Sequence, residues 1–144
     1  MNLHPDYPIV SGLLQMTAEW MVSLPETFNR RTEDGDLVLW RPALTFWIAA
    51  WGNDRGSSKD ERLASTLQTA SECRGEEQIE RTAELIRLTY ELPEEDPDRA
   101  VRTYKSISGY IFSESGELQI SAFFDTPAAR SIGYQVIHSV RNVA

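Results

Sequence analysis

The segment from Leu44 to Trp51 (LTFWIAAW) constrains the fold more than any other part of the chain. Successive side chains of an extended strand point to opposite faces, so this segment would be apolar on both. A strand of that kind is typical of the interior of a sheet that is covered on each side. We therefore expect a central strand here, with one face formed by Leu44, Phe46, Ile48 and Ala50 and the other by Trp47, Ala49 and Trp51.

Two further strands are predicted before this segment. Residues 37–40 (LVLW) form the first, which follows a turn at 33–36 and leads through a second turn at Arg41-Pro42-Ala43. Upstream, apolar side chains occupy every even position from Leu14 to Leu24, a period of two that indicates a half-buried strand. Pro25 should end this strand, because proline has no N–H with which to continue a ladder.

A helix is expected after the polar loop at 52–58. Ser58 and Glu61 match a capping box, and Leu63, Leu67 and Ala70 have the spacing of a buried helical face that stops near Arg74-Gly75. Downstream we expect a brief edge strand at 78–80 and strands at 86–92, 104–112 and 118–124, the last two joined by a hairpin loop at 113–117. A closing helix should begin at Asp125-Thr126-Pro127. Its inward face is expected to consist of Ala129, Ile132, Gly133, Val136, Ile137 and Val140.

These elements predict one α+β domain over residues 1–144, with an N-terminal arm at 1–13. A chain of 144 residues has the commonest size of a single domain. The expected architecture is a mainly antiparallel sheet of about six strands with helices packed on it, in the order β-β-β-α-β-β-β-α. One helix on each face would make an α/β/α-like sandwich, and the alternative is a helix on one face and a partner on the other.

The charge of the chain argues against several partners. It carries 14 basic and 22 acidic side chains, a formal net charge of −8, and neither half is basic. Nucleic acids and anionic membranes bind basic surfaces, so we expect neither as a partner. No apolar run is long enough to span a bilayer, no signal peptide is evident, and the single Cys73 suits a reducing compartment. These features predict a cytoplasmic protein.

The order of elements over about residues 14–143 resembles the PsbP-like fold. This fold is shared by the Ran-binding Mog proteins and by the Eag-type adaptor chaperones of type VI secretion. The resemblance includes a first strand that ends in Leu24-Pro25, a hairpin, a helix, an antiparallel set of strands and a closing helix. The fold group has no catalytic motif, and its members mostly bind other proteins. The resemblance therefore implies an adaptor, chaperone or immunity-type function.

The residues that could carry catalysis are few and scattered. His4 lies near the N-terminus, His138 follows a buried position of the last helix, and Cys73 lies near the end of a helix, where the dipole disfavours a thiolate. The acidic runs at 76–77 and 94–98 are typical of solvated surface. We therefore predict no catalytic residues, no metal site and no cofactor.

The candidate binding site is an aromatic patch on the central hairpin. Trp47 and Trp51 share one strand face, and Trp40 comes from the preceding strand. Tryptophan and arginine dominate interface hot spots, so this patch with the adjoining loop predicts a partner-binding surface made of Trp40, Trp47, Trp51, Asn53, Asp54 and Arg55. The alternative is that the rings form core under a helix.

Three hypotheses for function follow. The preferred one is a non-catalytic bacterial protein-binding module, either an adaptor or chaperone for a secreted effector or an immunity protein. The second is a small hydrolase or small-molecule-binding protein that uses a cleft near Asp54 and Arg55, with His138 as a further member. The third is a structural or oligomer-forming subunit, for which a homodimer is the simplest form.

Overall fold

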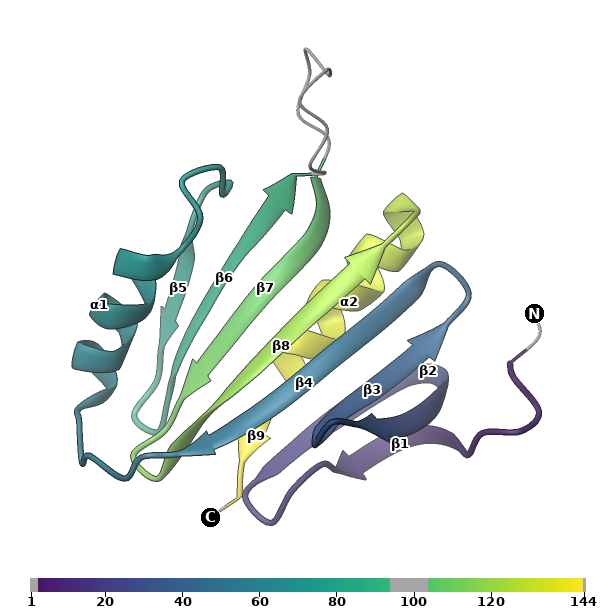
Figure 1. Ribbon diagram of the computed structural model, residues 1–144, viewed down its shortest axis with the longest axis horizontal. Coiled ribbons are helices and arrows are strands. Elements are labelled where there is room, and N and C mark those ends of the chain that lie inside the picture. Colours follow the sequence, from purple (N-terminus) through teal and green to yellow (C-terminus); the bar gives the residue numbers. More distant parts are fainter. Residues whose placement is uncertain (1–2, 94–103, 144) are drawn as a thin grey trace.

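The computed structural model describes residues 3–93 and 104–143, which form one antiparallel sheet with two helices (Figure 1). The strands and helices follow one another as β1 (Ile9–Gln15), β2 (Trp20–Glu33), β3 (Asp36–Arg41), β4 (Leu44–Gly52), α1 (Lys59–Thr69), β5 (Gln78–Arg81), β6 (Ile86–Pro93), β7 (Tyr104–Phe112), β8 (Gly116–Phe124), α2 (Pro127–Ser139) and β9 (Arg141–Asn142).

The sheet is built from two consecutive halves that meet in its middle. Its spatial order is β1-β2-β3-β4-β8-β7-β6-β5, and the short β9 pairs with β2. The halves join through β4 and β8, which pair along their whole length, from Leu44 opposite Phe124 to Gly52 opposite Gly116. The prediction that residues 44–51 form a central strand is therefore confirmed.

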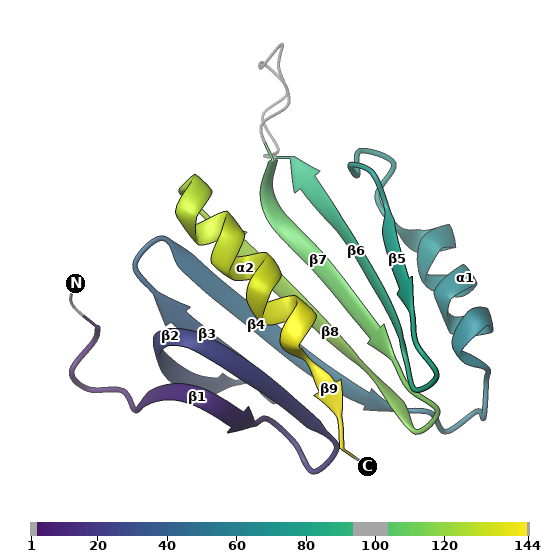
Figure 2. The same ribbon diagram turned by 180° about the vertical axis from the view of Figure 1, so that it is seen from behind.

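Helix α2 covers one face of this central region, as Figure 2 shows from behind. The helix begins where predicted, because the Thr126 hydroxyl accepts a hydrogen bond from the Ala129 N–H and Pro127 fills the first turn. At Gly133 the helix approaches the sheet so closely that an added Cβ would lie 3.1 Å from Ile107 Cδ1. The main core lies between them and contains Leu44, Phe46, Ile48, Ile107, Ile111, Leu118, Ile120, Ala122, Val136 and Ile137.

Helix α1 packs on the opposite face, and only at the β5 end of the sheet (Figure 1). The Ser58 side chain caps it as predicted by accepting a hydrogen bond from the Glu61 N–H. The helix ends at Thr69, earlier than the expected stop near Arg74-Gly75. Its buried Leu63 contacts a second, smaller cluster that contains Ile86, Leu88, Tyr90 and Phe112.

Most local predictions in the second half of the chain are confirmed. The edge strand, the strands at 86–92, 104–112 and 118–124, and the closing helix lie within about two residues of their expected bounds.

The two turns predicted around β3 are also present. At the turn over 33–36, Asp34 and Gly35 both adopt the positive φ typical of a tight hairpin turn. Pro42 occupies the second position of the next turn, and Ala43 beside it has a φ of +68°.

The fold class is confirmed as mainly antiparallel α+β, but its detail is corrected. The sheet has nine strands in the described residues rather than about six, and four strands instead of three precede α1. The predicted strand at 14–24 is wrong. A turn interrupts it, because the Met16 and Thr17 N–H groups both donate to the Trp20 carbonyl, and the chain reverses there into β2.

Two further predictions near the N-terminus also change. Residues 9–13 of the expected arm belong to β1. Pro25 does not end a strand, because it lies within β2 at a bulge, where the three residues 25–27 oppose Ser11 alone. Proline is tolerated at such a position, since the ladder is already interrupted there. The acidic loop at 94–98 lies outside the described residues.

Of the two ways in which both faces of β4 were expected to be covered, one helix on each face is wrong, and a helix on one face with a partner on the other stays a prediction. The two helices do lie on opposite faces, but α1 packs on β6 and β7, and its cluster contains no residue of β4. Neither helix of the described chain is long and apolar enough to cross a membrane.

Candidate functional site: an uncovered face of the sheet

The side of β4 and β8 that faces away from α2 carries no helix, and we call it the open face. Cross-strand pairs define it, because Trp47 lies opposite Ser121 and Trp51 lies opposite Glu117. Its members are Thr45, Trp47, Ala49 and Trp51 of β4 and Glu117, Gln119, Ser121 and Phe123 of β8.

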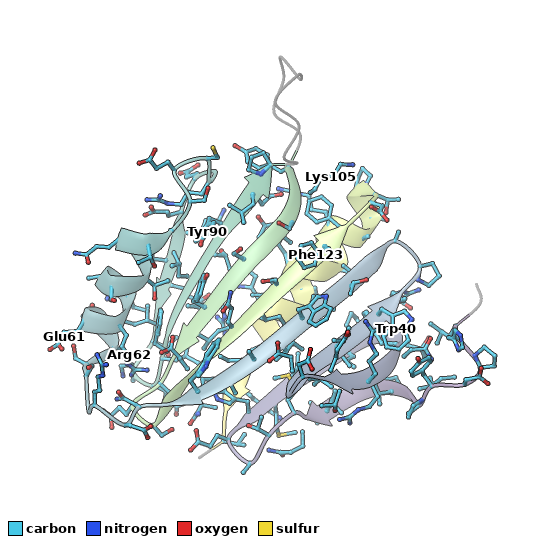
Figure 3. All side chains as sticks on the ribbon, in the orientation of Figure 1. Trp40, Glu61, Arg62, Tyr90, Lys105 and Phe123 are labelled. Atoms are coloured by element: carbon cyan, nitrogen blue, oxygen red, sulfur yellow. The ribbon has the colours of Figure 1, made fainter. Side chains whose placement is uncertain are left out.

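Two aromatic side chains of the open face are strongly exposed. Trp51 exposes 49% of its surface and Phe123 exposes 48%, whereas Phe46 and Ile120 on the covered face of the same strands expose none. Figure 3 shows Phe123 on the side of β8 turned away from α2. A soluble domain seldom leaves two large apolar side chains this open on neighbouring strands, and such patches commonly mark binding surfaces.

The surface between Trp47 and Trp51 is hollowed. A shallow depression of about 240 Å³ lies there, lined by Asp36, Trp47, Ile48, Ala49, Trp51, Gln119 and Ser121. The two indoles predicted from the sequence as one patch therefore border a common hollow, four residues apart on one strand. The walls are partly polar through the Gln119 and Ser121 side chains, which can donate and accept hydrogen bonds.

Trp40 and Trp47 have a structural role that the exposed Trp51 lacks. The Arg31 guanidinium of β2 lies 4.7 Å from the Trp40 ring and 5.9 Å from the Trp47 ring, and Glu33 binds the same guanidinium at 3.0 Å. Val38 lies between Arg31 and Trp47 in the strand register and is fully buried without a helix above it. These cation–π contacts hold that end of the face in place.

Three carboxylates lie near the exposed indole, and the Arg62 guanidinium interacts with one of them, Glu117. Asp36 lines the hollow, Glu117 lies directly opposite Trp51, and a Cβ added at Gly52 would lie 3.4 Å from an Asp54 oxygen. Arg31, the cation at the far end, is already paired with Glu33. An aromatic surface edged by acids attracts a partner that carries positive charge.

The three polar residues predicted for the site, Asn53, Asp54 and Arg55, lie in the loop after β4 and have different roles there. The Asn53 side chain holds the loop together, because its amide donates to the Ser57 and Glu114 carbonyls and its oxygen accepts from the Ser57 N–H. Asp54 and Arg55 are exposed in the turn that follows. Asn53 therefore positions the loop that adjoins Trp51, and the other two side chains remain accessible to a partner.

A second, polar hollow lies on the α2 side of the sheet. It measures about 570 Å³ and is lined by Gly75, Glu76, Gln78, Glu91, Tyr104, Arg130, Tyr134 and His138. Glu91 is held by Arg130 through two bonds of 2.8 and 2.6 Å, and the Tyr134 hydroxyl donates to it at 2.9 Å. The polar groups at the centre of this hollow are thus bonded to one another.

The titration of these groups follows from that pairing. Hydrogen bonds from Arg130 and Tyr134 outweigh burial and hold the pKa of Glu91 below its usual range. Burial and the bond to Glu91 raise the pKa of Tyr134 to about 12. At neutral pH Glu91 is an ion-paired carboxylate and Tyr134 a proton donor, so Glu91, Arg130 and Tyr134 form a fixed hydrogen-bond network.

The residues of the hydrolase hypothesis lie on separate elements. His138 is on α2, 3.5 Å from Glu80, while Asp54 and Arg55 lie in the loop after β4. Neither loop residue lines the hollow at the open face, the hollow beside α2 or the hollow near the 113–115 hairpin. Over residues 3–93 and 104–143, no group of three or more His, Cys, Asp or Glu side chains is arranged to hold a metal ion.

Sequence reasoning missed Phe123 and Arg31 as members of this region. Phe123 interrupts the polar face of an otherwise alternating strand, which is a signal that could have been used. Its place beside Thr45 depends on the pairing of β4 with β8, which joins residues 78 positions apart in the sequence at this point, and local spacing does not encode that pairing.

The chain matches no protein-family model, and no curated protein or solved structure matches it. The geometry of the open face is therefore the basis for assigning a function.

Proposed function

We propose that this chain is a non-catalytic protein-binding module and that the open face is its recognition surface. The observation that carries the proposal is the exposure of Trp51 and Phe123 on a central, uncovered part of the sheet. Indole and phenyl rings in such positions supply most of the binding energy at protein interfaces when a partner buries them. A hollow between two indoles gives a partner side chain a place to insert.

The partner we propose is a protein segment that is apolar and positively charged. Burial of Trp51 would favour apolar side chains, and the neighbouring Asp36 and Glu117 would favour lysine or arginine at the edges. The net charge of −8 would also speed the association of a basic partner. The resemblance to the PsbP-like group suggests an adaptor or chaperone for a secreted bacterial effector, or an immunity protein, acting in the cytoplasm.

The alternative is a small hydrolase or small-molecule-binding protein. Its support is the polar hollow beside α2, which contains His138 and the Glu91 network. The network is already internally bonded and Asp54 and Arg55 lie elsewhere, so we favour the protein-binding function.

The test uses a defined probe with purified, full-length chain. An amphipathic peptide of arginine and leucine is titrated into the wild type, and binding is measured by fluorescence anisotropy of a peptide label. The matched variants are Trp51→Ala and Phe123→Ser on the open face and Ile79→Ser on β5, which removes an apolar side chain of similar exposure, 42%, from one edge of the sheet.

We expect the two open-face variants to weaken binding by about tenfold or more each, because hot-spot truncations cost above 1.4 kcal/mol. Ile79→Ser should bind like the wild type. Equal binding by all four proteins would show that the acidic surface attracts the peptide without the open face, and would overturn the proposal.

A further inference from the structure

The two edges of the sheet differ in how they are protected. At one end, β5 is four residues long and carries Glu80 and Arg81, and Arg81 is ion-paired with Asp60 of α1. Short length and charge are the usual means by which proteins keep an edge strand from pairing with another chain. The β5 edge therefore has ordinary protection.

The β1 edge has neither of these protections. Its sequence, IVSGLLQ, has seven residues and no charge, and it forms the other margin of the sheet in both views (Figures 1 and 2). Within the described chain, β2 is the only strand that pairs with it. Ile9 and Leu13 are among the most exposed apolar side chains described, at 59% and 64%.

The pairing of β1 with β2 is irregular near its middle. Residues 25–27 of β2 bulge opposite Ser11, and within β1 itself Gly12 has a left-handed φ of +68°. Val10 and Leu14 pack against the main core, whereas Ile9 and Leu13 point away from it. The outer side of β1 thus combines unpaired backbone groups with two exposed apolar side chains.

The strand is complementary to a second copy of itself. In an antiparallel pair centred on Ser11, Ile9 of one chain lies opposite Leu13 of the other, and Leu13 lies opposite Ile9. The nearest preceding carboxylate, Asp6, would lie opposite Met16, so no like charges meet in spite of the net charge of the chain. Two apolar cross-strand pairs related by a two-fold axis are what an isologous dimer requires.

We propose that β1 pairs antiparallel with β1 of a second copy of this chain, which joins two sheets into one across a two-fold axis. This inference does not rest on the proposed function, since Leu13 and Ser11 lie outside the open face. An interface of one strand per chain is small, so we expect a dissociation constant of roughly 10–100 μM.

Sedimentation velocity of the full chain over a range of concentrations tests the proposal. The wild type should shift from monomer to dimer as its concentration rises. Leu13→Lys should raise the dissociation constant by about tenfold or more, because two lysines enter each interface beside apolar partners. Ile79→Lys, which makes the same change on β5, should leave the dissociation constant unaltered.

A cross-link tests the register directly. In the predicted dimer the two copies of Ser11 face each other with Cα atoms about 4.5–5.5 Å apart, a separation that a disulfide can bridge. Ser11→Cys in a Cys73→Ser background should form a disulfide-linked dimer on oxidation. Ser131→Cys, at an exposed position of α2, is the matched control and should cross-link far more slowly.

Three outcomes would overturn the proposed β1–β1 dimer. A wild type that stays monomeric near 1 mM, well above the expected constant, overturns the proposal. Equal effects of Leu13→Lys and Ile79→Lys, or equal cross-linking of the two cysteine variants, also overturn it. If Leu13→Lys failed to fold, as far-UV circular dichroism would reveal, the cross-link would decide alone.

Discussion

Both faces of the β4–β8 pair carry large apolar side chains, but only one face buries them. On one face Phe46, Ile120 and Ala122 are fully buried beneath α2. On the other face, one residue away along the same strands, Trp51 and Phe123 are about half exposed. The same backbone therefore supports a closed core and an open surface.

The difference teaches that apolar side chains on a central strand need not serve the stability of their own domain. The covered face needs its side chains because α2 packs into them, and a void there removes contacts that nothing replaces. On the open face Trp51 and Phe123 stay about half exposed, so their burial contributes less to folding than that of a fully buried ring. Variants on the two faces should separate stability from binding.

The largest effect is expected for Phe46→Ala on the covered face. Phe46 is fully buried and contacts the Phe28 ring, with centroids 5.6 Å apart. Its truncation should lower the free energy of unfolding by about 3–5 kcal/mol, as measured by urea denaturation. A loss below about 1 kcal/mol would mean that this face is no better packed than the open one.

Gly133→Leu should also destabilise the covered face, by about 1–3 kcal/mol or more. A side chain at this position must enter space held by Ile107 and Ala122, whose atoms would lie 3.1 and 3.3 Å from the first added carbon. Ala128→Leu, at an exposed position of the same helix, is the matched control, and thermal melts of both variants give the comparison.

Glu91→Gln should cost about 1 kcal/mol at neutral pH, a value reduced because Arg130 is half exposed. The folded pKa of Glu91 lies below its unfolded value, so its contribution is present above about pH 4.3 and is lost as the pH falls through the folded pKa. The difference in stability between the wild type and the variant should therefore shrink in acid. A difference that is constant between pH 7 and pH 3 would contradict the ion pair.

The smallest effect on stability is expected for Trp51→Ala, within about 0.5 kcal/mol of the wild type in urea denaturation. This variant distinguishes the two faces, because the same substitution should leave the stability nearly unchanged and weaken peptide binding strongly. A decrease of several kcal/mol in the free energy of unfolding would show that Trp51 belongs to the core, and the open face would then not be a separate binding surface.

The sequence predicted the local elements best where both ends of an element carried a signal. Ser58 and Thr126 identified the two helix starts, and the turns at 33–36 and 41–43 bounded β3. It failed between Leu14 and Leu24, where alternation continues across a turn and the period alone does not reveal the reversal. The candidate site was half predictable: Trp47 and Trp51 follow from spacing, whereas Phe123 depends on a distant strand.

The sequence by itself determined that residues 44–51 form a buried-type strand with two apolar faces, because alternation and capping act between residues close along the chain. Only the tertiary structure decided which face is covered. That outcome depends on the pairing of β4 with β8 and on the places where α1 and α2 pack, contacts between residues far apart in the chain. The same long-range packing leaves β1 at an edge and Trp51 in water.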